Sequence, residues 1–113
     1  MSDTCIFCKI ASKQIPVEAL YEDANFIAFR DMNPQAPIHI LIIPKVHIET
    51  IMELDSETLM TGAFRAVQAT AQLLNLTAEG FRTVVNCREN GGQTVYHLHF
   101  HLLGGRFMQW PPG

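Results

Sequence analysis

The chain has 113 residues, which fits one domain over 1–113, and 48% of them are hydrophobic, enough for a core without disulfides. A net charge of −3 argues against a protein that binds nucleic acid through bulk charge, and no apolar run is long enough to span a membrane. The first residues, MSDTCIFCKI, lack the basic and apolar stretches of a secretion signal. We therefore expect a cytoplasmic protein whose cysteines are thiols or metal ligands.

The first half of the chain predicts one short helix and two strands. Residues 5–13 are expected to be helical, and 25–31 (NFIAFRD) and 38–44 (IHILIIP) are expected to be strands, the second one central because of its β-branched run. The prolines of 33–37 (NPQAP) predict a turn between the two strands.

The second half predicts one long helix and two further strands. The sequence favours Asp55 as the N-cap of a helix through about Asn75. Its apolar residues recur at helical spacing and form a core or dimer face: Leu59, Ala63, Val67, Ala71 and Leu74. Residues 81–86 predict a strand, and the turn-rich segment 87–93 leads into a last strand. Strands joined by short turns, with one long helix, indicate an antiparallel α+β domain.

The last strand, TVYHLHFHLLGG (94–105), carries three of the five histidines at alternate positions. Alternate side chains of a strand share one face, so His97, His99 and His101 would form a row while the residues between them enter a core. From this spacing alone the row can be a metal site, a polar surface, or a catalytic site with a neutral imidazole as nucleophile. The glycines of the preceding loop can bring backbone N–H groups to an anion, which favours chemistry at phosphorus.

Cys5 and Cys8 form a Cys-x-x-Cys motif near the start of the chain. Two thiolates at this spacing can bind zinc together with two further ligands. A redox pair is the rival interpretation, although no βαβ pattern surrounds the motif, and packed thiols are a third. Cys87 lies in a loop and has no assigned role.

The segment His97-Leu98-His99-Phe100-His101-Leu102-Leu103 resembles the histidine triad, His-φ-His-φ-His-φ-φ, where φ is apolar. The likeness covers nearly the whole chain, including DMNPQAPIHILIIPKVHI, VVN and the ending GGRFMQWPPG. These segments look like the Hint branch, the histidine triad nucleotide-binding proteins, more than the branch that hydrolyses dinucleoside polyphosphates. The resemblance implies a homodimer with a five-stranded antiparallel sheet, one long helix and a short N-terminal helix per subunit. It also implies binding of purine nucleoside monophosphates and hydrolysis of phosphoramidates through a covalent nucleotidyl-histidine.

The resemblance implies a catalytic role for four residues. His99 matches the nucleophile, His101 matches the residue that contacts the phosphate oxygens, and His39 matches a histidine that supports the nucleophile through a proton network. Thr94 stands where a serine is usual, and its hydroxyl or a cationic His101 would pass a proton to the leaving amine. This chemistry requires no metal or other cofactor.

The remaining matches concern nucleotide binding. Asn86, Gln93 and Thr94 match positions at the phosphate and leaving group, and Asp31 matches the ribose-binding carboxylate. Arg30 stands where animal Hint proteins have histidine. The base pocket of the family matches four side chains: Phe7, Ile10, Phe29 and Met32.

The resemblance further implies a structural zinc site and a functional tail. Some members of this superfamily bind zinc through Cys-x-x-Cys and two histidines, which here correspond to Cys5, Cys8, His47 and His97. Trp110, near the end of the chain, is expected to reach the partner subunit's active site in the homodimer. Two other classes of function stay open, a nucleotide-binding interaction protein with little turnover and a metal-dependent enzyme that uses the three triad histidines as ligands.

Overall fold

A computed structural model describes residues 4–113, so residues 1–3 of the expected domain lie outside the described residues. The elements follow in the order α1 (Ile6–Ala11), β1 (Tyr21–Glu22), β2 (Phe26–Arg30), β3 (Ile38–Pro44), the 3-10 helix η1 (Ile51–Glu53), α2 (Glu57–Leu73), β4 (Arg82–Val84) and β5 (Phe100–Gly104). The five strands form one sheet in the order β1-β2-β3-β5-β4, and every neighbouring pair is antiparallel. The predicted α+β class, with five antiparallel strands, one long helix and a short N-terminal helix, is confirmed.

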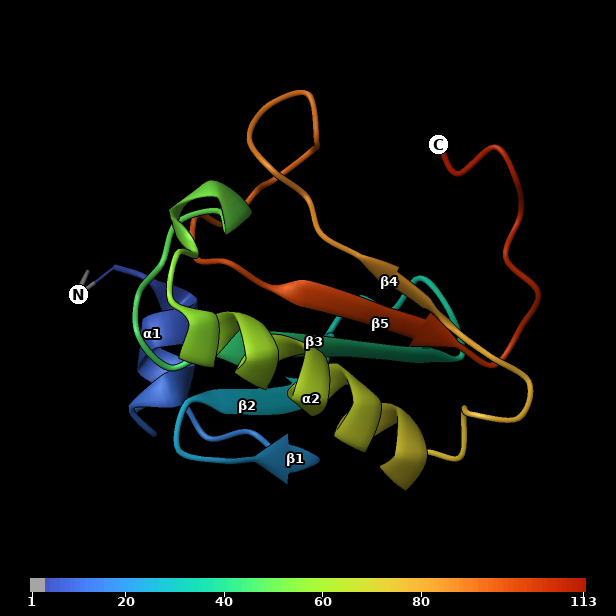
Figure 1. Cartoon of the computed structure of the whole chain (residues 1–113), viewed down its shortest axis with the longest axis horizontal. Helices are drawn as coiled ribbons and strands as arrows, with labels where there is room; N and C mark the ends of the chain where they lie inside the picture. Colours follow the sequence, from blue (N-terminus) through green and yellow to red (C-terminus); the bar gives the residue numbers. More distant parts are fainter. Residues whose placement is uncertain (1–3) are drawn as a thin grey trace.

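Helix α2 lies across one face of the sheet, as Figure 1 shows. The buried side chains of α2 are small, so the helix approaches the strands closely, and they include Ala63, Val67 and Ala71 from the predicted apolar stripe. Opposite them the sheet presents a fully buried layer: Phe26, Ala28, Ile40, Ile42, Phe100 and Leu102. This face is the main hydrophobic core, and it confirms the core interpretation of the stripe.

The other face of the sheet packs against α1. Phe7 and Ile10 of α1 form a second buried cluster with Ile27, Phe29, Leu41 and Ile43 from β2 and β3. The helix lies at the end of the sheet where β2 and β5 begin and β3 ends (Figure 1). The residues just beyond these strand ends therefore meet α1.

The histidine segment is less regular than predicted, because β5 begins only at Phe100. Its pairing with β3 starts at Ile42 opposite Phe100, and its pairing with β4 starts at Val84 opposite His101. The residues just before Phe100 lie outside the sheet, and the backbone N–H of Leu98 donates to the carbonyl of Ile48 at 2.6 Å. Leu98 nevertheless joins Phe100 and Leu102 in the main core and is fully buried, and its neighbours His97 and His99 are buried as well.

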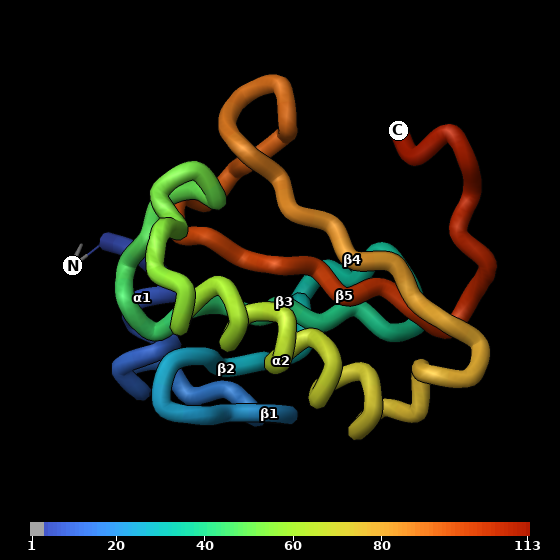
Figure 2. Tube along the Cα trace, viewed as in Figure 1, coloured from blue at the N-terminus to red at the C-terminus, as the bar shows by residue number. Residues whose placement is uncertain are grey.

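Several other boundaries differ from the prediction. Helix α1 and strand β2 are shorter than the predicted 5–13 and 25–31, and α2 ends at Leu73 rather than about Asn75. The N-cap of α2 is Ser56 rather than Asp55, because the Ser56 hydroxyl accepts from the backbone N–H of Leu59, three residues into the helix. Strand β4 covers Arg82–Val84, which is shorter than the predicted 81–86. Figure 2 shows the chain between β4 and β5 projecting as a long loop beyond the sheet, and the tail after β5 leaving at the end opposite the N-terminus. Among residues 4–113, no helix has both the length and the apolar character needed to cross a membrane.

Candidate active site

Helix α1 brings the two cysteines of the Cys-x-x-Cys motif to His47 and His97, which lie just outside β3 and β5. The Cys8 Sγ is 3.1 Å from His47 Nδ1, and the Cys5 Sγ is 3.3 Å from His97 Nδ1. The four ligand atoms lie within 4.8 Å of one another. We call these four residues the thiol–imidazole cluster. Two sulfurs and two imidazole nitrogens are a donor set that suits a tetrahedral zinc ion.

The hydrogen bonds of His97 prepare it as a ligand. Its Nε2 lies 2.8 Å from the backbone carbonyl of Pro44, which can only accept, so Nε2 carries the proton. The lone pair of His97 then lies on Nδ1, the atom that faces Cys5 and Cys8. Burial lowers the pKa of His97 to about 4, and this keeps the imidazole neutral. A backbone carbonyl behind a histidine ligand is the usual way in which such a tautomer is fixed, so the cluster fits a metal ion.

His97, a member of the thiol–imidazole cluster, also orients His99. The His99 Nδ1 lies 2.8 Å from the backbone carbonyl of His97, so Nδ1 carries the proton and donates it to that carbonyl. The lone pair of the imidazole is therefore on Nε2. Phe7 of α1 packs edge-on against both rings, with ring centroids 5.8 Å from His97 and 5.1 Å from His99. The nucleophilic tautomer expected of His99 is thus supported by the surrounding backbone.

His101 forms a pair with His39 on the neighbouring strand β3. His101 stands opposite Leu41 and His39 stands opposite Leu103, so the two imidazoles are diagonal neighbours on one face. The His39 Nε2 lies 2.9 Å from the His101 Nδ1. The family resemblance implies that His39 supports the nucleophile through a proton network, and the direct partner of its Nε2 is His101, the third histidine of the triad.

A backbone donor decides which way the protons of this pair point. The N–H of Gln35 donates to His39 Nδ1 at 3.0 Å, so the proton of the His39 imidazole is on Nε2. The His39 Nε2–H then donates to His101 Nδ1, and this leaves the proton of His101 on its Nε2. Burial, with a further contribution from the imidazoles of His99 and His39, lowers the pKa of His101 to about 4. His101 is therefore a neutral N–H donor at neutral pH and not a cation.

Asp31 lies beside this pair at the end of β2. Its Oδ2 is 3.5 Å from His39 Nε2, and its Oδ1 accepts from the backbone N–H of Asn33. The carboxylate partly offsets the effect of burial, which lowers the pKa of His39. Asp31, His39 and His101 also place their ligand atoms within 4.8 Å of one another. Among the described residues, no group of candidate metal ligands combines all three triad histidines, because His97 faces the thiols and His101 faces His39.

The loop before the histidine segment is held together by two of the predicted site residues. The Gln93 side chain donates to the carbonyls of Glu49 and Val95 and accepts from the N–H of Arg88. The Asn86 side chain donates to the carbonyl of Gly91. The backbone N–H groups of Gly92 and Gln93 donate to carbonyls within the loop, so neither is directed toward an anion. Thr94 follows the loop and is exposed.

Three of the four residues matched to the base pocket lie together. Phe7, Ile10 and Phe29 belong to the buried cluster under α1, and the Phe7 and Phe29 rings are 6.0 Å apart in an edge-on arrangement. Met32 is different, because 98% of it is exposed. A contact between Met32 and a base would therefore lie at the open surface.

The chain combines an antiparallel sheet with three histidines at alternate positions, two just before β5 and one within it. This combination defines a histidine triad fold. A family model described as the HIT domain matches residues 12–108, and the chain belongs to that family. It is 51% identical to an uncharacterized HIT-like protein of Synechococcus elongatus over the full length of both chains. It is 43% identical to Protein HitA of Neisseria gonorrhoeae, over 90% of this chain and 96% of that protein.

Solved structures agree with this assignment. A HIT family hydrolase from Legionella pneumophila has a TM-score of 0.92 at 49% identity, covering 97% of this chain and 100% of that chain. A histidine triad nucleotide-binding protein from Candida albicans has a TM-score of 0.84 at 31% identity, covering 96% of this chain and 83% of that chain.

Sequence reasoning missed two contacts of the site, both made through Gln35. The N–H of Gln35 fixes the His39 tautomer, and its carbonyl accepts from the Arg106 guanidinium at 3.0 Å. A backbone group leaves no signature in the side-chain sequence. Arg106 follows Gly104, the last residue of β5, and Gly105, and only the pairing of β3 with β5 could have placed it near this turn.

Proposed function

We propose that the protein is a hydrolase that cleaves purine nucleoside phosphoramidates through a covalent nucleotidyl-His99 intermediate, as expected for the Hint branch. The observation that carries the proposal is the hydrogen bond from His99 Nδ1 to the His97 carbonyl, which leaves a lone pair on Nε2. A nitrogen nucleophile needs that lone pair to attack phosphorus. The name of the Legionella pneumophila structure, a HIT family hydrolase, supports the reaction class.

In the first proposed step, His99 Nε2 attacks the phosphorus, and the bond between phosphorus and the leaving nitrogen breaks. Negative charge collects on the non-bridging oxygens, where the His101 Nε2–H can donate. The leaving amine takes a proton relayed by the Thr94 hydroxyl, or one from His101 after the bound anionic phosphate has made that imidazole cationic, because a neutral imidazole is too weak an acid. The pKa of about 4 means that His101 is neutral before substrate binds, so it acts first as a hydrogen-bond donor.

In the second proposed step, water attacks the phosphorus of the nucleotidyl-histidine. The bond between phosphorus and His99 Nε2 breaks, and the nucleoside monophosphate leaves as His99 regains its lone pair. The group that lost a proton to the amine takes one from the attacking water. No step passes through the thiol–imidazole cluster, whose zinc ion would tie α1 to the ends of β3 and β5.

Nucleotide recognition is proposed to use the apolar cluster and Asp31. Phe7 and Ile10 of α1 would lie against the purine, and the Asp31 carboxylate would accept from a ribose hydroxyl. Asp31 is partly buried, and one of its oxygens is already fixed by the Asn33 N–H, so the carboxylate is held in place before the nucleotide arrives. The name of the Candida albicans structure, a nucleotide-binding protein, supports this part.

We also propose that the chain forms a homodimer. Strand β4 is at the edge of the sheet, and an edge strand offers unpaired backbone groups. The outer side of α2 exposes large apolar side chains, with 63% of Phe64 and 42% of Met60 accessible. Light scattering should give twice the chain mass, and a monomer at micromolar concentration would contradict this proposal.

The test of the function is intact mass analysis during turnover of adenosine 5′-monophosphoramidate. The expected result is release of the nucleoside monophosphate together with a nucleotidyl adduct on the wild-type protein that is absent from His99→Ala. A binding protein would take up the nucleoside monophosphate without turnover, and a dinucleoside polyphosphate hydrolase would prefer diadenosine polyphosphate in a parallel assay. Activity lost after EDTA treatment of a still-folded protein would favour a metal-dependent mechanism.

A further inference from the structure

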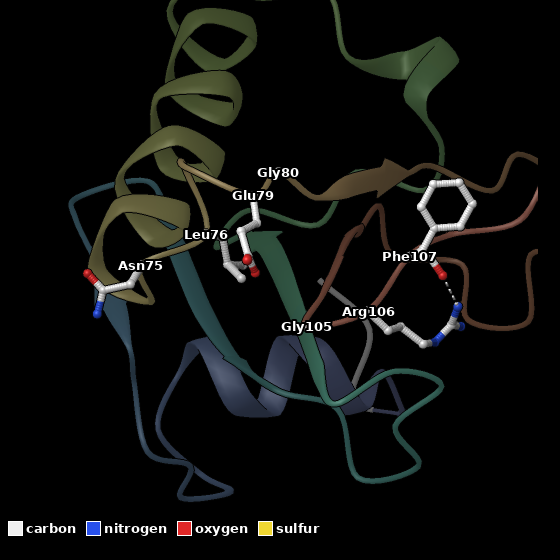
Figure 3. Close-up of a pocket in the computed structure, with 7 residues that line it drawn as sticks. All are labelled: Asn75, Leu76, Glu79, Gly80, Gly105, Arg106 and Phe107. Atoms are coloured by element: carbon white, nitrogen blue, oxygen red, sulfur yellow. Dashed lines mark hydrogen bonds between the residues drawn. The ribbon is translucent and has the colours of Figure 1, made fainter.

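The side chain of Arg106 connects two separate backbone segments. Its Nη1 donates to the carbonyl of Phe107 at 3.1 Å, and its Nη2 donates to the carbonyl of Gln35 at 3.0 Å. Arg106 lines a cavity of about 390 Å³. Figure 3 shows its guanidinium turned toward the Phe107 carbonyl. The planar guanidinium can serve two carbonyls at once, whereas a lysine ammonium has no such fixed geometry.

The meeting of Arg106 with Gln35 follows from the sheet. Ile38 at the start of β3 stands opposite Gly104 at the end of β5, so the residues just outside these strands run side by side. Gly105 makes the approach possible, because its φ is +88° and a Cβ there would lie 2.9 Å from the Pro37 Cβ. The tail is thus able to cross the 33–37 turn closely enough for Arg106 to reach Gln35.

Gln35 in turn bonds to the histidine pair. Its N–H donates to His39 Nδ1 at 3.0 Å, and His39 Nε2 lies 2.9 Å from His101 Nδ1. If the Gln35 N–H moved away, His39 could carry its proton on Nδ1 and accept through Nε2. His101 would then carry its proton on Nδ1 and turn a lone pair toward the phosphate oxygens, which would repel them. Asp31 Oδ2, 3.5 Å from His39 Nε2, also favours the productive tautomer, so Gln35 shares this task.

We propose that Arg106 is a positioning residue for catalysis: by holding the Gln35 carbonyl it keeps the Gln35 N–H on His39, and so keeps a proton on His101 Nε2. This inference rests on the proposed role of His101 as a donor to the phosphate. Arg106 does not touch the reacting atoms, and its effect passes through one backbone residue and two imidazoles. Through Arg106, the tail after β5 helps to set the tautomers of His39 and His101.

The experiment compares full-length Arg106→Gln and Arg106→Lys with Arg65→Gln. Arg65 is an exposed arginine on α2, so its variant controls for the loss of one positive charge. Histidine side-chain ¹⁵N NMR distinguishes protons on Nδ1 from protons on Nε2. We expect Nε2–H signals for His39 and His101 in wild type and Arg65→Gln, and mixed tautomers in Arg106→Gln. Arg106→Lys should restore part of the wild-type pattern, because it can still donate one hydrogen bond.

Kinetics provide a second measurement. With a phosphoramidate substrate, kcat of Arg106→Gln should fall about 10-fold, as expected for the loss of one hydrogen bond to a charged group, while KM changes little. Unchanged tautomers in Arg106→Gln would overturn the inference, and so would an equal loss of kcat in Arg65→Gln. The NMR measurement needs no turnover. A wild-type protein without phosphoramidase activity would therefore refute the proposed function. The NMR measurement of the His39 and His101 tautomers would still test the role of Arg106.

Discussion

The thiol–imidazole cluster makes a quantitative prediction about zinc and thermal stability. If zinc binds the native protein and not the unfolded chain, free zinc at about 1,000 times its dissociation constant adds about 4 kcal/mol to the free energy of unfolding. At about 2.1 cal/mol/K per residue, the unfolding entropy of a chain of 113 residues is about 240 cal/mol/K. The melting temperature should therefore rise by about 17 °C between the metal-free and the loaded protein, and by about 6 °C for each further tenfold increase in free zinc.

The assay is calorimetry of chelator-stripped protein at buffered free zinc concentrations. Cys5→Ser with Cys8→Ser should remove the dependence on zinc, whereas Cys87→Ser should keep it, because Cys87 lies outside the cluster. The double variant should also lose more stability than activity at 25 °C, since a closed site offers substrate no open position. A melting temperature that does not respond to zinc in wild type, or that responds equally in the double variant, would refute the site.

The remaining predictions concern the histidines and the tail. His99→Ala should abolish turnover, while His101→Ala should lower it by about 10²–10⁴-fold and leave nucleotide binding measurable by calorimetry; turnover of His99→Ala near the wild-type rate would end the covalent mechanism. Deleting residues 109–113, which removes the exposed Trp110, should change the ratio of kcat/KM between bulky and minimal phosphoramidates with little effect on nucleoside monophosphate affinity, and an unchanged ratio in a dimeric truncated protein would exclude the tail from substrate choice. Burial holds the pKa of His97 and His101 near 4, below the ordinary 6.5, so between these values the unfolded chain binds protons that the native protein does not. The urea midpoint of metal-free protein should therefore fall as the pH is lowered from about 6.5 toward 4, and a constant midpoint would contradict neutral buried imidazoles.

The sequence predicted those parts of the fold whose side-chain patterns are long. The β-branched run of 38–44 coincides with β3, and the apolar spacing of the long helix places Ala63, Val67 and Ala71 in the core. Strand β1 was missed because two residues, Tyr21 and Glu22, are too few to show a period. The start of β5 was misplaced because its pairing with β3 begins only at Phe100 and its pairing with β4 only at His101, while the Leu98 N–H donates to the Ile48 carbonyl of another segment.

The sequence predicted which residues belong to the candidate site better than it predicted the hydrogen bonds between them. The pattern of the triad and the family resemblance indicated His39, His99 and His101 as site residues, but the bond between His39 and His101 depends on the diagonal register of β3 and β5. The resemblance also matched Gln93 to the phosphate region. Its observed hydrogen bonds instead fix the 87–93 loop, and only a folded loop could reveal them. Its role at the phosphate stays a prediction.

From Leu98 to Leu102, successive side chains point to opposite faces of the chain, and this limits where residues can be inserted or deleted. Leu98, Phe100 and Leu102 are buried in the core, while His99 and His101 point to the opposite face. Removing or adding one residue within this stretch would exchange the two sets, placing imidazoles in the core and hydrocarbon at the site. Insertions and deletions are therefore compatible with the fold only outside this stretch, in segments such as the projecting loop before it. Single substitutions within the stretch can change either the site or the core without changing the other.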